Sequence, residues 1–179
     1  MAMVEFGLLL PVLAVFLFGT IEVSRYLLLN QKLDKAVNAM ADFATQGLNI
    51  RTAEIDGYAA AIPQIMKPFS FNGTVIFTSA IHYNNGIPPC QDASVVCISW
   101  QVRKLGNDTS KIGAVGDGAT LPDGYEVKPG QNVIAAEIYM DYQPLLSISG
   151  TLIPSLAAHK LYRVVAYKPR ARNLGILGN

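Results

Sequence analysis

Charged side chains are scarce in this chain, and Glu5 is the single charged residue before Glu22. Lys, Arg, Asp and Glu make up 15% of the 179 residues, against about 25% in ordinary globular proteins. The formal net charge is +1, and no Lys- or Arg-rich run with interleaved aromatics is present. A nucleic-acid-binding protein is therefore not expected.

Catalytic motifs are also lacking. The sequence contains no G-x-S-x-G elbow, no P-loop and no H-E-x-x-H. His82 and His159 have no nucleophile in a suitable context, so we interpret both as structural or solvated. Asp108, Asp117 and Asp123 do not follow the spacing of a calcium loop. We expect no enzyme, no cofactor and no metal.

The chain has two cysteines, Cys90 and Cys97. An even count at short spacing predicts a local disulfide, which is typical of an oxidising compartment. Closing this small loop would stabilise the fold by about 2–3 kcal/mol in the chain-entropy model. Two free thiols, or a zinc site completed by His82 and His159, are the alternatives.

A long apolar run opens the chain. Residues 1–21 match the ~20 apolar residues that cross a bilayer core of about 30 Å. No basic leading region and no small-residue cleavage site accompany the run, so we expect it to be retained rather than removed as a signal peptide. Glu5 is costly there, on the order of 2.5–3.5 kcal/mol for a charge at mid-membrane. Either Glu5 lies at the membrane edge, or it has a partner.

The helical pattern continues beyond the apolar run. Residues 2–47 are predicted to form one helix about 70 Å long. Pro11 predicts a bend or a melted turn within its apolar part. A stripe at helical spacing in the second half is expected to pack on a sheet: Leu29, Leu33, Val37, Met40 and Ala44.

A second helix and four strands are predicted after residue 50. Thr52 is expected to cap the helix, and Pro63 to kink or split it. Alternation with period two then predicts an antiparallel sheet, from the segments GTVIFTSAIHY, SVVCISWQVRKL, NVIAAEIYMDY and HKLYRVVAYK. The expected fold is α+β, a long N-terminal helix plus a small antiparallel sheet backed by helix.

Three regions are expected along the chain. Residues 1–25 would form the transmembrane and assembly helix, and residues 26–70 its amphipathic continuation and the second helix. Residues 71–179 would form the sheet domain. Within that domain, residues 105–132 are rich in Gly, Asp and Pro and predict a long exposed loop. The apolar connection PLLSISGTLIP predicts a short helix.

The opening residues resemble those of a known family. VEFGLLLPVLAVFLFGTIEVSR is similar to the opening of TadE-like pseudopilins of the tight-adherence pilus, a branch of the type IV pilin superfamily. YQPLL at 142–146 and YRVVAYKPRA at 162–171 are similar to its closing strands. The residues that carry the N-terminal resemblance are Val4, Glu5, Phe6, Pro11, Gly19, Glu22 and Arg25.

The resemblance implies a role for Glu5. In that superfamily a prepilin peptidase removes a short basic leader and leaves Glu as the fifth residue, as Glu5 is here. The carboxylate would pair with the amine of Met1 in a neighbouring subunit, and setting register is the best-attested use of such buried pairs. Pro11 and Gly19 would allow local unwinding. Glu22 and Arg25 are expected to pair on one helix face or to contact another subunit.

The resemblance also implies a function and a place in the cell. The chain would be a minor pilin or pseudopilin, held in the inner membrane by one span and then assembled into an extracellular pilus. Its partners would be other pilins, the prepilin peptidase, membrane lipid, and a membrane platform with a cytoplasmic ATPase.

The charges after the apolar run bear on orientation. Arg25, Lys32 and Lys35 follow it, which alone would hold the sheet domain in the cytoplasm. A removed basic leader would place that domain in the periplasm instead. Two alternatives stay open: the main subunit of the filament, and a membrane-anchored periplasmic binding domain that never polymerises.

Overall fold

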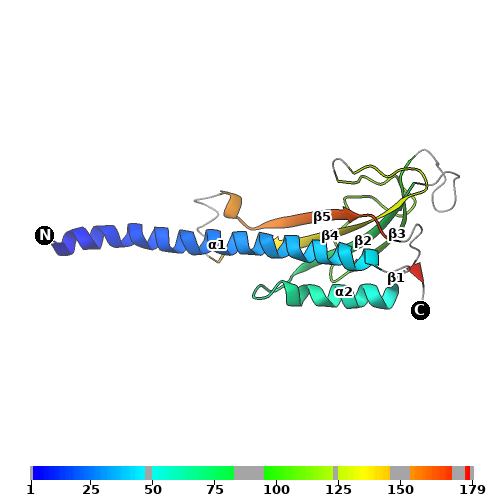
Figure 1. Ribbon diagram of the computed structural model, residues 1–179. Helices are drawn as coiled ribbons and strands as arrows, with labels where there is room; N and C mark the ends of the chain where they lie inside the picture. The colour runs from blue at the N-terminus through cyan, green and yellow to red at the C-terminus, as the bar shows by residue number, and fades with distance from the viewer. Residues whose placement is uncertain are drawn as a thin grey trace.

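The computed structural model describes residues 2–46, 50–82, 95–122, 125–145, 154–170 and 176–177. Two helices and a sheet dominate the fold, and the N-terminal half of the first helix projects beyond the rest (Figure 1). This confirms the predicted α+β class. The elements in chain order are α1 (Ala2–Gln46), β1 (Ile50–Arg51), α2 (Thr52–Ile65), β2 (Gly73–Ile81), β3 (Cys97–Lys104), β4 (Asn132–Tyr142), the 3-10 turn η1 (Pro154–Leu156), β5 (His159–Tyr167) and β6 (Ile176–Leu177).

Helix α1 is continuous over 45 residues, with Pro11 inside it. The melted turn that was one alternative at Pro11 is therefore not formed, and the bend, which was the other, stays a prediction. A proline removes one backbone hydrogen bond and crowds the carbonyl four residues earlier. The leucine- and phenylalanine-rich turns on either side keep the helix intact across that local loss.

The main sheet has four strands in the order β3-β2-β4-β5, and each neighbouring pair is antiparallel. The period-two segments of the sequence correspond to these strands, so all four strand predictions are confirmed. Phe77 of β2 lies opposite Ala136 of β4, which lies opposite Val165 of β5. The short strands β1 and β6 form a separate parallel pair.

The core lies between the helices and one face of the sheet. The stripe of α1 predicted to pack there is buried, and it includes Leu33 and Met40. Phe77 of β2 is another large side chain of this core. Helix α2 adds Ile55 and Ile62. Each such side chain contributes roughly 1.5–3 kcal/mol when fully buried.

Helix α2 begins differently from the prediction. Arg51 is the capping residue, and its backbone N–H donates to Glu54 Oε2 at 2.9 Å. Thr52 is therefore the first helical residue and not the cap. Pro63 lies two residues before the end of α2, so too little helix follows it to form a second segment, and the helix is not split. The kink predicted as the alternative stays a prediction.

The second face of the sheet is covered by part of the segment predicted as an exposed loop. That prediction is wrong for Ile112 and Val127, which are 2% and 8% exposed and pack with Ile98 and Ala135. These apolar residues stand singly among glycines and prolines, so they form no periodic pattern that would predict burial. They are buried nonetheless, because they pack against an apolar face of the sheet. Gly113 and Gly116 have φ of 135° and 92°, which glycine adopts readily.

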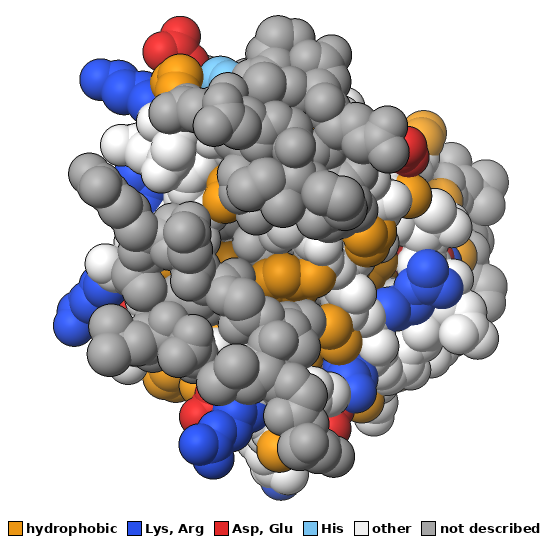
Figure 2. All heavy atoms as spheres, turned by 90° about the vertical axis from the view of Figure 1, so that its right-hand side faces the viewer, with side chains coloured by type: hydrophobic (Ala, Val, Ile, Leu, Met, Phe, Trp, Pro, Cys, Tyr) orange, Lys and Arg blue, Asp and Glu red, His pale blue; other side chains and the backbone are white. Residues whose placement is uncertain are grey.

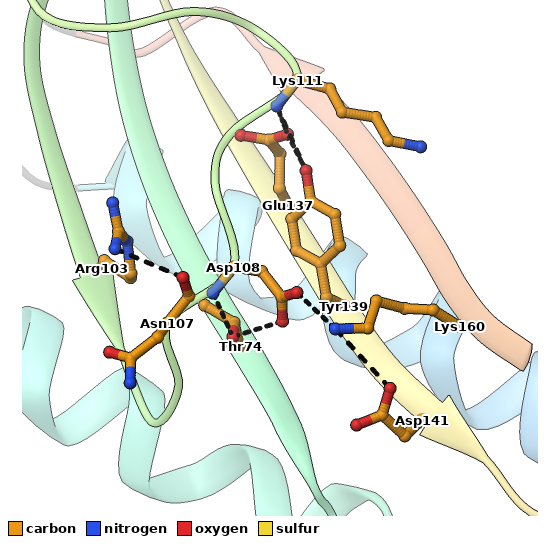
Figure 3. A network of polar contacts seen from close by, with 9 residues as sticks. All are labelled: Thr74, Arg103, Asn107, Asp108, Lys111, Glu137, Tyr139, Asp141 and Lys160. Atoms are coloured by element: carbon orange, nitrogen blue, oxygen red, sulfur yellow. Dashed lines mark hydrogen bonds and ion pairs between the residues drawn. The ribbon is translucent and has the colours of Figure 1, made fainter.

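Residues 107–112, called the strap below, are fastened to the sheet by the buried carboxylate of Glu137 on β4 (Figure 3). Glu137 Oε1 accepts hydrogen bonds from the Lys111 N–H at 3.0 Å and the Tyr162 hydroxyl at 2.9 Å. Tyr139 donates to the same oxygen at 3.2 Å, and the Ser110 hydroxyl donates to Oε2. Burial, together with the Glu137 charge, raises the pKa of both tyrosines, which therefore stay protonated as donors.

A second carboxylate fastens the other end of the strap (Figure 3). Asp108 accepts a hydrogen bond from the Thr74 hydroxyl at 2.7 Å and forms an ion pair with Lys160. Lys160 also lies 3.6 Å from Asp141. The hydrogen bonds from Lys160 and then Thr74 lower the pKa of Asp108. The strap thus joins β2 to β5 across the face opposite the helices.

Candidate functional site

The projecting part of α1 is apolar and uncovered. An 18-residue window of this helix has mean hydropathy 2.2 and is only 6% buried, so the helix is long and apolar enough to cross a membrane. Glu5 and Glu22 are separated by about 26 Å at 1.5 Å per residue, close to the ~30 Å of a bilayer core. So large an apolar surface marks contact with lipid or protein. Its most exposed large side chains are Met3, Phe6, Leu8, Leu13, Phe16 and Leu17.

The opposite end of the molecule has a mixed surface. Figure 2 shows Lys and Arg side chains around its edge and hydrophobic side chains between them. The head, defined here as the described residues from Ile50 onward, therefore differs from the projecting helix, which carries no charge between Phe6 and Ile21. The two parts suit different surroundings, water for the head and an apolar medium for the helix.

The predicted site residues nearest the N-terminus lie on the uncovered part of α1. Glu5 is exposed in the first turns of α1. A Cβ built at Gly19 would meet nothing within 4 Å. Met1 and Cys90 lie outside the described residues. Cys97 is buried at the start of β3, and its pairing with Cys90 stays a prediction.

Glu22 occupies the point where the head first covers the helix. Its side chain is 1% exposed, whereas Ile21 and Val23 on either side are 42% and 38% exposed. Glu22 Oε1 accepts a hydrogen bond from the Tyr142 hydroxyl at 2.7 Å. The Leu145 N–H lies 3.1 Å from Oε1 and 3.0 Å from Oε2. The carboxylate is thus held by the end of β4 and the residues that follow it.

Local structure explains why those donors face α1. Strand β4 ends at Tyr142, and Pro144 has no N–H with which to continue a ladder, so the Leu145 N–H can turn to the helix. The Tyr142 ring meets Tyr26 edge-on, with ring centroids 5.0 Å apart. Burial raises the pKa of Tyr142, and the hydrogen bond to Glu22 and the charge of Glu22 raise it further. The hydroxyl therefore keeps its proton.

Arg25 also reaches the head. Its guanidinium carbon lies 5.9 Å from the centre of the Phe69 ring, within the range of a cation–π contact. The sequence predicted a Glu22–Arg25 pair on one helix face, and it missed both contacts with the head. Glu22 and Tyr142 are 120 positions apart, beyond any local pattern. The signal that was present is YQPLL, which contains both Tyr142 and Leu145.

The two histidines contact backbone carbonyls. His82 Nδ1 lies 2.9 Å from the Val127 oxygen, and His159 Nδ1 lies 2.7 Å from the Ala157 oxygen. These contacts agree with the interpretation of both as structural. In the part of the chain that the structure describes, no group of three or more His, Cys, Asp or Glu side chains could hold a metal ion.

The architecture is a long apolar helix joined to a small antiparallel sheet with a second helix. The model of the TadE-like protein family matches residues 1–42, about a quarter of the chain. This confirms the predicted resemblance over α1, and TadE-like proteins are structural pilus components rather than enzymes. The similarity of YQPLL and YRVVAYKPRA to the closing strands lies beyond the matched residues and stays a prediction. No curated protein and no solved structure matches this chain.

Proposed function

We propose that this chain is a minor pilin or pseudopilin of a tight-adherence pilus, held in the inner membrane and then assembled into a filament by α1. The observation that carries the proposal is the exposed apolar helix that projects from a folded head. The match of residues 1–42 to the TadE-like family supports the same function.

The physical cycle follows from the helix surface. In the membrane, its side chains contact lipid tails, which are as apolar as the side chains themselves. Moving the helix from lipid into a bundle of helices therefore gains little hydrophobic free energy, and packing must supply the attraction. Extraction requires work, which we assign to a cytoplasmic ATPase and its membrane platform. A prepilin peptidase would act earlier, by removing a basic leader.

Glu5 is the residue we assign to register. Its carboxylate is exposed in the first turns of α1, and burying it unpaired in an apolar bundle of helices would be costly. Pairing with the amine of Met1 in a neighbouring subunit would remove that cost at one axial position and not at others. Pro11 and Gly19 would ease local unwinding when the helix enters the filament. The main-subunit role and the simple membrane tether are the competing functions.

Membrane extraction and protease accessibility test the first stage of this cycle. In native cells the chain should stay in the membrane pellet after alkaline carbonate washing, because the apolar span is retained. Protease added to spheroplasts should digest the head, since we place it in the periplasm. Recovery of the chain in the carbonate supernatant, or a head protected until the inner membrane is opened, would contradict this placement.

A further inference from the structure

We infer that Glu22 is a positioning residue that fixes the orientation of the head on the assembly helix. The inference rests on the proposed function, because orientation matters once α1 packs among other helices. Its basis is the pair of head donors, the Tyr142 hydroxyl and the Leu145 N–H, that meet one buried carboxylate of α1. Glu22 thus acts within the subunit, whereas Glu5 is assigned to contacts between subunits.

The chemistry of this contact makes it directional. Apolar packing tolerates small rotations, but hydrogen bonds weaken steeply when donor and acceptor are misaligned. Successive residues on a helix are rotated by about 100°. A shift of one residue would place Ile21 or Val23 against Tyr142 and leave a buried hydroxyl and N–H without their acceptor. One rotational setting of the head is therefore strongly preferred.

Other contacts hold the head on α1 farther from the membrane-compatible segment. Arg163 Nε donates to Asp34 Oδ1 at 2.7 Å, and the Tyr167 hydroxyl donates to Asn38 Oδ1 at 2.7 Å. The apolar core lies beside these pairs. Weakening the Glu22 contact should therefore leave the head folded and attached. What changes is the angle at which the projecting helix leaves the head.

This angle links two surfaces that must fit at once in a filament. The projecting helix has to meet neighbouring helices, while the head meets neighbouring heads. A head free to pivot at Glu22 would satisfy one set of contacts at the expense of the other. We therefore expect loss of the Glu22 contact to reduce assembly more than it reduces stability.

Two matched tyrosine variants test this inference. Tyr142→Phe and Tyr162→Phe each remove one phenolic hydroxyl that donates to a buried glutamate, but only Tyr142 reaches α1. Both should lower the melting temperature of the detergent-solubilised full chain by similar amounts, about 2–4 °C. Tyr142→Phe should reduce recovery in sheared filaments by about fivefold, and Tyr162→Phe should leave recovery unchanged. Equal losses for the two variants, or no loss for either, would overturn the positioning role.

Glu22 variants supply an independent check. Glu22→Gln keeps one acceptor oxygen for Tyr142 and Leu145, so it should retain more incorporation than Glu22→Leu, which keeps none. A Glu22→Leu chain that incorporates as well as wild type would contradict the inference.

Hydrogen exchange of the purified full chain separates this inference from the proposed function, because it needs no filament. The peptide containing the Leu145 amide should exchange about tenfold faster in Glu22→Leu than in wild type. In Tyr162→Phe its exchange rate should equal that of wild type. If the wild-type chain is absent from filaments but this exchange pattern is observed, the proposed function is wrong and the contact of Glu22 with the head is still supported. If exchange of that peptide does not change in Glu22→Leu, the contact of Glu22 with the head is refuted.

Discussion

Replacing Glu5 with Gln is expected to remove the chain from surface filaments while leaving it in the membrane pellet. Gln has nearly the same shape, but it carries no charge to pair with an amine in an apolar bundle. Losing ~1.4 kcal/mol or more per subunit contact would lower incorporation at least about tenfold. Insertion should not suffer, because a neutral side chain is cheaper in lipid than a carboxylate. The measurement is quantitative immunoblotting of sheared filaments and of carbonate-washed membranes.

Glu126→Gln is the matched control for this change. Glu126 is an exposed head residue, and its replacement also removes one negative charge. It should leave both fractions at wild-type levels. Normal incorporation of Glu5→Gln would contradict the register role and favour a simple membrane tether. Loss of Glu5→Gln from the membrane pellet as well would indicate an insertion defect and would also contradict it.

Replacing Glu137 with Ala is expected to lower the free energy of unfolding by about 3–5 kcal/mol. The carboxylate is fully buried and accepts from the strap and from two tyrosines. Its removal would leave those donors buried without an acceptor and release the strap from β4. Urea unfolding of the detergent-solubilised full chain, followed by the fluorescence of Trp100, measures the change.

Two other variants bracket that result. Glu137→Gln keeps an acceptor oxygen and should lose less stability than Glu137→Ala. Glu126→Ala removes an exposed carboxylate and should change the free energy of unfolding by less than about 0.5 kcal/mol. Should Glu137→Ala unfold at the same urea concentration as Glu126→Ala, the Glu137 contact would not be what holds the strap.

The parts of the fold that follow from the sequence are those governed by local period. The stripe from Leu29 to Ala44 predicted the buried face of α1, because side chains three and four apart share a helix face. Alternation predicted β2, β3, β4 and β5, because successive side chains of a strand point to opposite faces. The apolar run predicted a helix long enough to cross a membrane, because about 20 apolar residues at helical rise match the bilayer core.

The contacts that escaped prediction depend on distant residues. Glu22 was predicted to pair with Arg25 on the same helix. In the structure its carboxylate accepts hydrogen bonds from Tyr142 and Leu145, at and just beyond the end of β4. Ile112 and Val127 looked like isolated apolar residues in a loop, and they bury only because a sheet face is there to receive them. No periodic pattern in the nearby sequence marks these contacts, so they could not be predicted from it.

The predicted cap at Thr52 and the predicted melted turn at Pro11 were wrong for a different reason. Thr52 is a good capping residue by type, but the N–H of Arg51 and the side chain of Glu54 place the boundary one position earlier. Pro11 removes one backbone hydrogen bond from a helix of 45 residues, and the helix continues through it. Local preference in both places was overridden by neighbouring residues.

Assembly through α1 is tested by the recovery of this chain in filaments sheared from native cells, with and without the assembly ATPase. We expect the chain to be present in filaments from wild-type cells. In cells that lack the ATPase it should be absent from the sheared fraction and retained in the inner membrane. A chain that stays in the membrane in both strains, with no filament signal, would contradict assembly through α1 and make the helix a tether.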